Sequence, residues 1–249
     1  MARRMFYVDE VRGGRAELLG ETAQHLRKVL RAERGFRYEI SDNTAIYLAE
    51  ITDFGKDRIE FKVIERLEAV APPASIHLFP ALIKFDAFEW MLEKATELGV
   101  ESITPVYAAR SDKGLDQAAA KRSDRWRRII HESGQQSRRV TRPTLNAPVR
   151  LMEALACESS VRLFLDEQRK GAPILSCLQN QPASTVLVVG PEGGWDDGER
   201  EIARDWTAVS LGPQILRAET AALAALAVIA AAYQKKPPAE AGGFLFSRF

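Results

Sequence analysis

The change of pattern at Pro72-Pro73 constrains the fold of this chain more than any other feature. Before it, segments rich in β-forming residues alternate with glycine or asparagine turns, at 5–8, 15–19, 37–41, 45–51 and 58–67, with one short helix expected over 23–29. Two successive prolines can continue neither a strand ladder nor a helix interior, so they favour a linker. The sequence therefore predicts a small β-barrel domain over 1–72 and a second domain over 73–249.

After the prolines, strand and helix patterns alternate. Apolar runs at 76–83, 102–107, 161–165, 185–189 and 208–211 indicate strands. Segments with helical spacing lie between them, at 87–98, 121–137, 174–178, 197–206 and 220–234. Gly99 follows the first of these helices as a C-terminal cap. This alternation is typical of an α/β domain with a parallel sheet covered on both faces.

Composition excludes several classes of protein. Apolar residues make up 46% of the chain and charged residues 28%, as in ordinary soluble globular proteins. Cys157 and Cys177 have no metal-ligand or redox spacing, which predicts no metal site and fits a reducing compartment. No signal peptide is recognised, and the longest apolar run, 221–233, is shorter than the roughly 20 residues that span a bilayer. We expect a cytoplasmic protein without a membrane partner.

Positive charge is concentrated in two regions although the net charge is only +1. Eight Lys and Arg residues lie between 121 and 142, against Asp124 and Glu132, and the first 37 residues are also basic. Such clusters suit a polyanion whose phosphates they neutralise. A solvated helix face is the alternative for a single charge run. Two separate regions favour nucleic acid.

A glycine-rich turn follows the apolar run at 185–189. It reads Gly190-Pro191-Glu192-Gly193-Gly194, and the next helix has Asp196 as N-cap with Glu199 three residues later, the spacing of a capping box. Ligands bind outside the carboxyl ends of parallel strands, and glycines there allow close approach to the backbone. The spacing matches neither a dinucleotide fingerprint nor a P-loop. It predicts a ligand pocket, with a purely geometric tight turn as the alternative.

A second loop, 211–220, has the same order of strand, Gly-Pro turn and helix. If the two strands are adjacent, both loops converge on one pocket. Arg217, Glu219 and Thr220 then lie at the start of the last helix, whose free N–H groups favour an anionic or acceptor atom. The alternatives make Arg217 a surface salt-bridge partner and Thr220 a simple N-cap. The last helix is apolar nearly all round, so we expect a second subunit to cover part of it.

Together the two loops resemble the cofactor loops of the SPOUT methyltransferases, most closely those of the ribosomal RNA small subunit methyltransferase E family. That family carries G-P-E-G-G after one strand and L-G-x-R-(I/V)-L-R-x-E-T-A after another, matched here by 190–194 and 211–221. Further similarity at 25–31, 94–100, 104–105, 110–111 and 135–139 extends the resemblance over both domains. Gln214, Gln135 and the turn at 41–43 depart from the family pattern.

The resemblance implies a PUA-like RNA-binding β-barrel followed by a SPOUT methyltransferase domain with a trefoil knot. It also implies a homodimer formed through the knotted domain and S-adenosyl-L-methionine (SAM) as cofactor. The implied reaction is methylation of N3 of a uridine in 16S ribosomal RNA, in the decoding region of the small ribosomal subunit. Alternatives are a SPOUT 2′-O-methyltransferase acting on another RNA and a non-catalytic RNA-binding protein. A nicotinamide-dependent enzyme is disfavoured by the missing fingerprint.

Site residues follow from the same resemblance. Arg217 is the candidate for stabilising negative charge on the base oxygens, and Glu219 is the candidate base. The expected cofactor-binding residues are Leu165, Val189, Gly190, Pro191, Glu192, Gly193, Gly194, Leu211, Gly212, Ile215, Leu216, Arg217, Thr220 and Ala221. The expected RNA-binding residues are Arg4, His25, Arg27, Arg31, Lys84, Gln136, Arg138 and Arg139.

Overall fold

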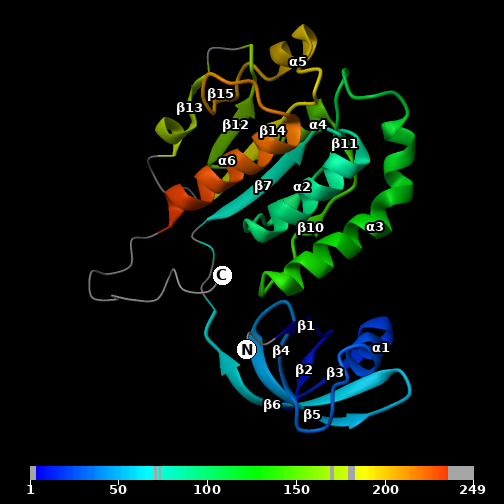
Figure 1. Cartoon of the computed structure of the whole chain (residues 1–249). Coiled ribbons are helices and arrows are strands. Elements are labelled where there is room, and N and C mark those ends of the chain that lie inside the picture. Colours follow the sequence, from blue (N-terminus) through cyan, green and yellow to red (C-terminus); the bar gives the residue numbers. More distant parts are fainter. Residues whose placement is uncertain (1–3, 70–71, 73, 169–170, 179–182, 235–249) are drawn as a thin grey trace, which may run out of the picture.

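The computed structural model contains two large β-sheets, each with its own hydrophobic core, and one two-stranded sheet (Figure 1). It describes residues 4–69, 72, 74–168, 171–178 and 183–234. Part of the expected linker around Pro72-Pro73 and the expected C-terminal tail from Pro237 onward lie outside the described residues. Within the described part of the chain, no helix is long and apolar enough to cross a membrane.

The smaller sheet is built from the N-terminal segment. Its strands are β1 (Met5–Tyr7), β2 (Val11–Arg12), β3 (Arg15–Leu19), β4 (Arg37–Ser41), β5 (Ile46–Phe54) and β6 (Arg58–Leu67), in the order β1-β4-β5-β6-β3-β2. Alternation places Leu18 and Ile59 in the core, where they meet Leu26 of α1 (Gly20–Lys28). Among the described residues no pairing joins β1 to β2, so closure into a barrel stays a prediction.

The larger sheet is parallel throughout, as predicted. Its order is β10-β8-β7-β14-β12-β15-β13, and a separate pair joins β9 (Val106–Tyr107) to β11 (Val149–Arg150). The run expected as one strand over 102–107 is two, because Pro105 has no N–H to donate and the chain changes partner there. The strands are β7 (Ser75–Pro80), β8 (Ser102–Ile103), β10 (Thr144–Leu145), β12 (Val161–Leu165), β13 (Ala172–Pro173), β14 (Ser184–Val189) and β15 (Thr207–Ser210).

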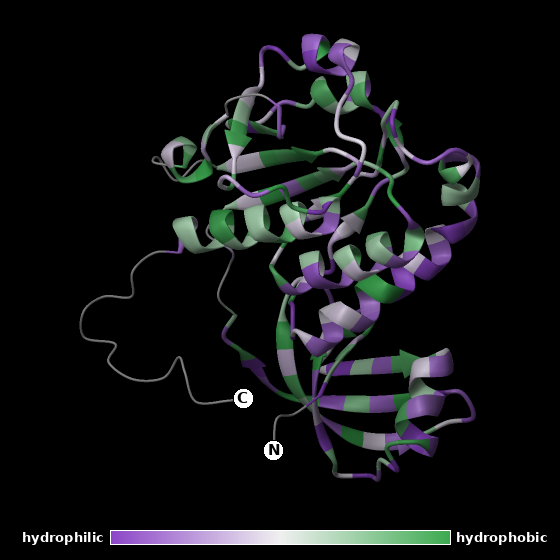
Figure 2. Cartoon of the chain, turned by 45° about the horizontal axis from the view of Figure 1, so that its top comes forward, coloured by the Kyte–Doolittle hydropathy of each residue, from purple (hydrophilic) through white to green (hydrophobic). Residues whose placement is uncertain are grey.

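Helices cover both faces of this sheet. One face packs against α2 (Phe85–Glu97), α3 (Leu115–Gln136) and α6 (Ala218–Tyr233), and the other against α4 (Leu151–Leu155) and α5 (Asp197–Ile202). Figure 2 shows that α6 is more apolar than α3, and α2 contacts both of them. Residues 174–177 form a 3-10 turn. Gly99 has φ of 92°, which fits the predicted cap after α2. Sequence patterns do not predict α4, β2, β10, β11 and β13, because elements of two to five residues carry too little periodicity.

The two sheets meet where the end of α3 packs against β1 (Figure 1). This junction is made of polar contacts. Arg138 donates its Nε to buried Glu39 at 2.8 Å, and Tyr7 donates its hydroxyl to the carbonyl of Arg139 at 2.8 Å. Ser41 donates to the carbonyl of Val140 at 2.6 Å. Burial raises the pKa of the Tyr7 hydroxyl to about 12, so it stays a donor at any physiological pH.

Candidate functional site

Three strands of the larger sheet end at the same level. Leu165 of β12 lies opposite Val189 of β14 on one side and opposite Val209 of β15 on the other. The sequence suggested that the two strands carrying the glycine-containing loops are adjacent. They are not, because β12 lies between them. One intervening strand separates their ends by only about 10 Å, twice the usual spacing of neighbouring strands. The loops can still meet above the end of β12.

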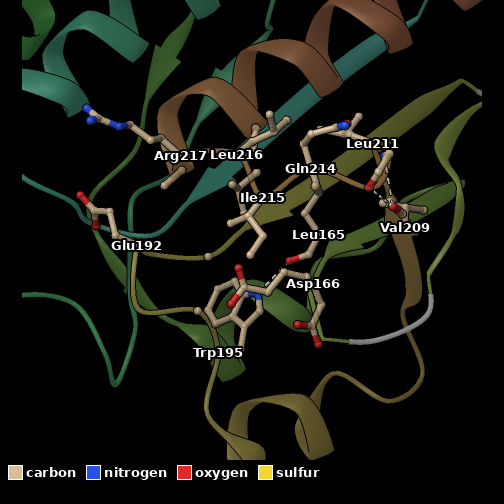
Figure 3. Close-up of a pocket in the computed structure, with 18 of the residues that line it drawn as sticks. Leu165, Asp166, Glu192, Trp195, Val209, Leu211, Gln214, Ile215, Leu216 and Arg217 are labelled. Carbon is tan, nitrogen blue, oxygen red and sulfur yellow. Dashed lines mark hydrogen bonds between the residues drawn. The ribbon is translucent and has the colours of Figure 1, made fainter.

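A pocket of about 330 Å³ lies between these loops (Figure 3). All the residues expected to bind the cofactor line it, except Gly193 and Thr220. Sequence reasoning missed the two carboxylates that directly follow β12 and the tryptophan that directly follows Gly194, although their positions after a predicted strand and turn could have suggested them. The lining residues that were not expected are Asp166, Glu167, Trp195, Val209, Ser210, Pro213, Gln214 and Ala218.

Trp195 fixes the glycine-rich loop to the sheet. Its side chain is only 1% exposed and stacks on Phe164 with ring centroids 4.8 Å apart. Its indole N–H donates to the carbonyl of Leu165 at 2.9 Å. A Cβ at position 190 would come within 3.0 Å of the indole ring. Gly190 thus makes room for the protein's own tryptophan, whereas the sequence suggested room for a ligand.

The loop then enters α5 through the predicted capping box. Asp196 Oδ1 accepts from the backbone N–H of Glu199 at 2.7 Å, and Glu199 Oε2 accepts from the N–H of Asp196 at 2.9 Å. Further along α5, Arg200 Nε donates to Asp166 at 2.9 Å, and the Asp166 side chain is 1% exposed. The hydrogen bond with Asp166 raises the pKa of Arg200, so the guanidinium stays charged. The loop is anchored at both ends.

The second loop is much more open. Residues 212–217 are all exposed, and Ile215 is 83% exposed. Side-chain hydrogen bonds join Ser210, just before the loop, to Gly212. Ser210 Oγ accepts from the Gly212 N–H at 3.2 Å. Helix α6 begins with extended Arg217 as its N-cap, and no side chain caps it. The alternative of Thr220 as N-cap is therefore wrong, and the first N–H groups of α6 lack intrahelical acceptors beside the pocket.

The two candidate catalytic residues are placed differently. Arg217 lines the pocket on the same side as Glu192, away from Gln214 and Leu211 (Figure 3). Among the described residues, no carboxylate pairs with Arg217, so the salt-bridge alternative finds no support. Glu219 lies in the first turn of α6, is partly exposed and does not line the pocket. The structure thus brings Arg217 to the pocket without Glu219.

A second cleft, of about 850 Å³, separates α3 from β1 and α1. Four residues expected to bind RNA line it: Arg4, His25, Gln136 and Arg138. It also contains Arg128, His131 and Gln135, which were not expected. Burial lowers the pKa of His131, and the charge of Arg142 adds to this effect. His131 is therefore neutral near pH 7.

The other four residues expected to bind RNA do not line this cleft. Arg139 is half-buried and donates to the carbonyl of Thr96 at 2.9 Å, which makes it a structural contact. Arg27 lies over the ring of Phe54 at 5.9 Å, and Arg31 is exposed just after α1. Lys84 is exposed at the N-terminus of α2.

Ion pairs within α3 and with α2 engage much of the basic run on α3. Buried Glu89, which comes from α2, pairs with Arg122 at 3.1 Å and with Arg125 at 2.7 Å. Arg127 pairs with Asp124, and Arg128 pairs with Glu132. The run alone suggested a phosphate-binding face, but most of these charges already have acidic partners.

Comparison with known proteins gives a consistent result. A family model described as "RNA methyltransferase domain" matches residues 71–230. The ribosomal RNA small subunit methyltransferase E of Aquifex aeolicus is 31% identical over 229 residues, which covers 90% of this chain and 98% of that one. The enzyme of the same name from Bacillus subtilis is 31% identical, covering 85% of this chain and 88% of that one.

Solved structures show the same similarity. The ribosomal RNA small subunit methyltransferase E of Neisseria gonorrhoeae, bound to SAM, is 30% identical with a TM-score of 0.83 and covers 92% of this chain and 97% of that one. A Legionella pneumophila protein with bound SAM is also 30% identical with a TM-score of 0.83, covering 93% of this chain and 98% of that one. The similarity therefore extends over both sheets.

Proposed function

The chain belongs to the ribosomal RNA small subunit methyltransferase E family, and we propose that it transfers a methyl group from SAM to N3 of a uridine in 16S ribosomal RNA. The observation that carries the proposal is the pocket between the two loops at the ends of β14, β12 and β15. Relatives at about 30% identity have SAM bound in their structures. We propose that this uridine lies in the decoding region of the small subunit.

The residues present fit this cofactor. A volume of about 330 Å³ lies within the range of small-molecule sites, roughly 300–1,000 Å³. Apolar side chains such as Leu165 and Leu211 suit a purine ring, and exposed Glu167 and Glu192 offer carboxylate oxygens for hydroxyl or ammonium groups. The first N–H groups of α6 suit a carboxylate. When bound, SAM supplies a methyl group on a positively charged sulfur.

The chain's own residues would then position the target base. Arg217 lines the pocket and its guanidinium extends to the side of Glu192 (Figure 3), where it would stabilise the negative charge that develops on the uracil oxygens. The N3 proton must leave, and Glu219, in the first turn of α6, is the proposed base. Alignment of the two reacting atoms supplies most of the remaining rate gain, since the reaction is a single displacement.

We further propose how the chain binds RNA and assembles. The cleft that contains Arg4, His25, Gln136 and Arg138 would hold RNA. Arg27, Arg31 and Lys84 are exposed outside this cleft and would add further contacts to the RNA. A target base inside a duplex would have to flip out, at a cost of roughly a few kcal/mol. We also propose a PUA-like domain over 1–72, a trefoil knot in the domain over 73–249, a homodimer through that domain and a cytoplasmic location.

The decisive experiment is transfer of a labelled methyl group to small ribosomal subunits from a strain that lacks this methylation. The modified nucleoside is then identified by mass spectrometry. We expect a uridine methylated at N3. A 2′-O-methyl product would favour the ribose-methylating alternative. Tight RNA binding without any methyl transfer or SAM uptake would favour the non-catalytic one.

A further inference from the structure

We propose that Glu199 is a positioning residue, which sets the shape of the cofactor pocket from behind the glycine-rich loop. Glu199 does not line the pocket. It ties that loop to the segment 108–111, which follows β9. This inference rests on the proposed function, because it concerns the same SAM site.

Both carboxylate oxygens of Glu199 are committed to backbone donors from different segments. Oε2 accepts from the N–H of Asp196, at the end of the glycine-rich loop, at 2.9 Å. Oε1 accepts from the N–H of Ala109, which is 90 residues away in sequence, at 2.8 Å. Glu199 is only 8% exposed, so its buried carboxylate depends on these two backbone donors for hydrogen bonds. A capping box needs only the first of these bonds.

The segment 108–111 is itself fixed to the sheet. Ser111 Oγ donates to the carbonyl of Leu82, which follows β7, at 2.7 Å. Arg110 Nη1 donates to the carbonyl of Gly193 at 3.1 Å. A Cβ at position 193 would lie 3.1 Å from Arg110 Cβ. The segment therefore supports the glycine-rich loop at two points, Gly193 and Asp196.

This arrangement explains why Gly193 is the one residue of 190–194 that does not line the pocket. It faces Arg110, while Gly190, Glu192 and Gly194 line the pocket. Contacts on the opposite side of the loop restrict movement of the backbone that lines the pocket. Glu199 provides that support through the Ala109 bond.

The test compares Glu199→Gln with Asp196→Ala in the full-length protein. The glutamine keeps the shape of the side chain, but its NH₂ group faces one of the two N–H donors. Asp196→Ala removes the other half of the capping box and leaves the Ala109 bond intact. For each variant, calorimetry gives the Kd for SAM, steady-state assays give KM for SAM and kcat, and a melting curve gives Tm. Glu201→Gln, on the exposed side of α5, is the matched control.

We expect Glu199→Gln to weaken SAM binding and raise KM for SAM by about tenfold, with a smaller change in kcat. Asp196→Ala should lower Tm but leave the Kd within about twofold of wild type. If Glu199→Gln binds SAM as wild type does, or if Asp196→Ala weakens binding equally, Glu199 only caps α5 and the inference is wrong. A wild-type protein that takes up no SAM would instead contradict the proposed function.

Should Glu199→Gln fail to fold, Arg110→Met decides the question. Arg110 is exposed, so this change should leave Tm unaltered while removing the tie to Gly193. A rise of about threefold in the Kd for SAM supports the positioning role of the 108–111 segment. An unchanged Kd contradicts it.

Discussion

The two loops that form the pocket are opposites in how they are held. The glycine-rich loop, 190–196, is fixed by buried Trp195, by the capping box and by a hydrogen bond from Arg110. The loop 211–217 has exposed residues from Gly212 to Arg217 and few side-chain contacts. Both follow strands that end at the same level of one sheet.

This difference suggests a division of roles. A loop anchored in the core keeps its geometry before any ligand arrives, which lowers the entropic cost of binding. An exposed loop with an 83% exposed isoleucine gains its contacts when a ligand covers it. We infer that the first loop is the rigid wall of the pocket and the second is the wall that a ligand orders.

The strongest test of the rigid wall is Trp195→Ala. Removing a fully buried tryptophan should lower the free energy of unfolding by about 3–5 kcal/mol, since it leaves a cavity beside Phe164. SAM binding should weaken as well. Urea denaturation followed by circular dichroism gives the first quantity. The control is Trp206→Ala, another buried tryptophan, which does not line the pocket and should cost stability without affecting SAM binding.

Arg217→Ala tests the open wall. Because Arg217 is exposed, the free energy of unfolding should change by less than about 0.5 kcal/mol. The rate of methyl transfer should fall by about 100-fold or more, as when a donor to a developing negative charge is lost. Single-turnover assays with saturating RNA and SAM measure this rate. Full turnover with normal RNA affinity would remove Arg217 from the mechanism.

Hydrogen exchange should separate the loops directly. Without SAM, the amides of 214–217 should exchange quickly and those of 194–196 slowly, because only the latter are buried or hydrogen-bonded. With SAM at about 100 times its Kd, protection in the second loop should rise by up to about 100-fold. Mass spectrometry of peptides from the two loops gives both rates. Equal protection of both loops without SAM would refute the contrast.

A pH scan is expected to give the smallest effect. It tests whether the difference between the two loops is independent of the junction between the sheets. His131 lies at the junction of the sheets, far from both loops in the fold, and its pKa is lowered below 6.5 by burial and by the charge of Arg142. The neutral form is favoured in the folded state, so its stabilising contribution is full above pH 6.5 and is lost as pH falls through the lowered pKa. His131→Gln should reduce the loss of stability between pH 7 and 5, measured by urea denaturation. The exchange difference between the loops should persist in this variant.

Local patterns predicted most of the regular elements. The strands at 15–19, 37–41, 58–67 and 161–165 have the predicted bounds, because alternation and apolar runs depend on neighbours in sequence. The capping box of α5 was readable for the same reason. The end of α5 was placed four residues too late and the start of α3 six residues too late. Helix ends depend on contacts as much as on propensity.

Such local patterns do not predict contacts between segments that are distant in sequence. Nothing in the basic run on α3 indicates that Glu89 pairs with two of its arginines. Similarly, the sequence suggests that Gly190 leaves room for a ligand, but Trp195 occupies that space. Both errors have one cause: a side chain's partner is chosen by proximity in space, which periodicity does not encode.

The sequence by itself determined the class of the fold, a parallel sheet with helices on both faces, and the two loops that form the pocket. These follow from hydrophobic periodicity and from turn residues, which act over a few positions of chain. Only the tertiary structure decided that β12 lies between the two loop-bearing strands and that Glu199 reaches Ala109. Strand order and hydrogen bonds across 90 residues depend on how the whole chain buries its apolar surface, and no short segment specifies that.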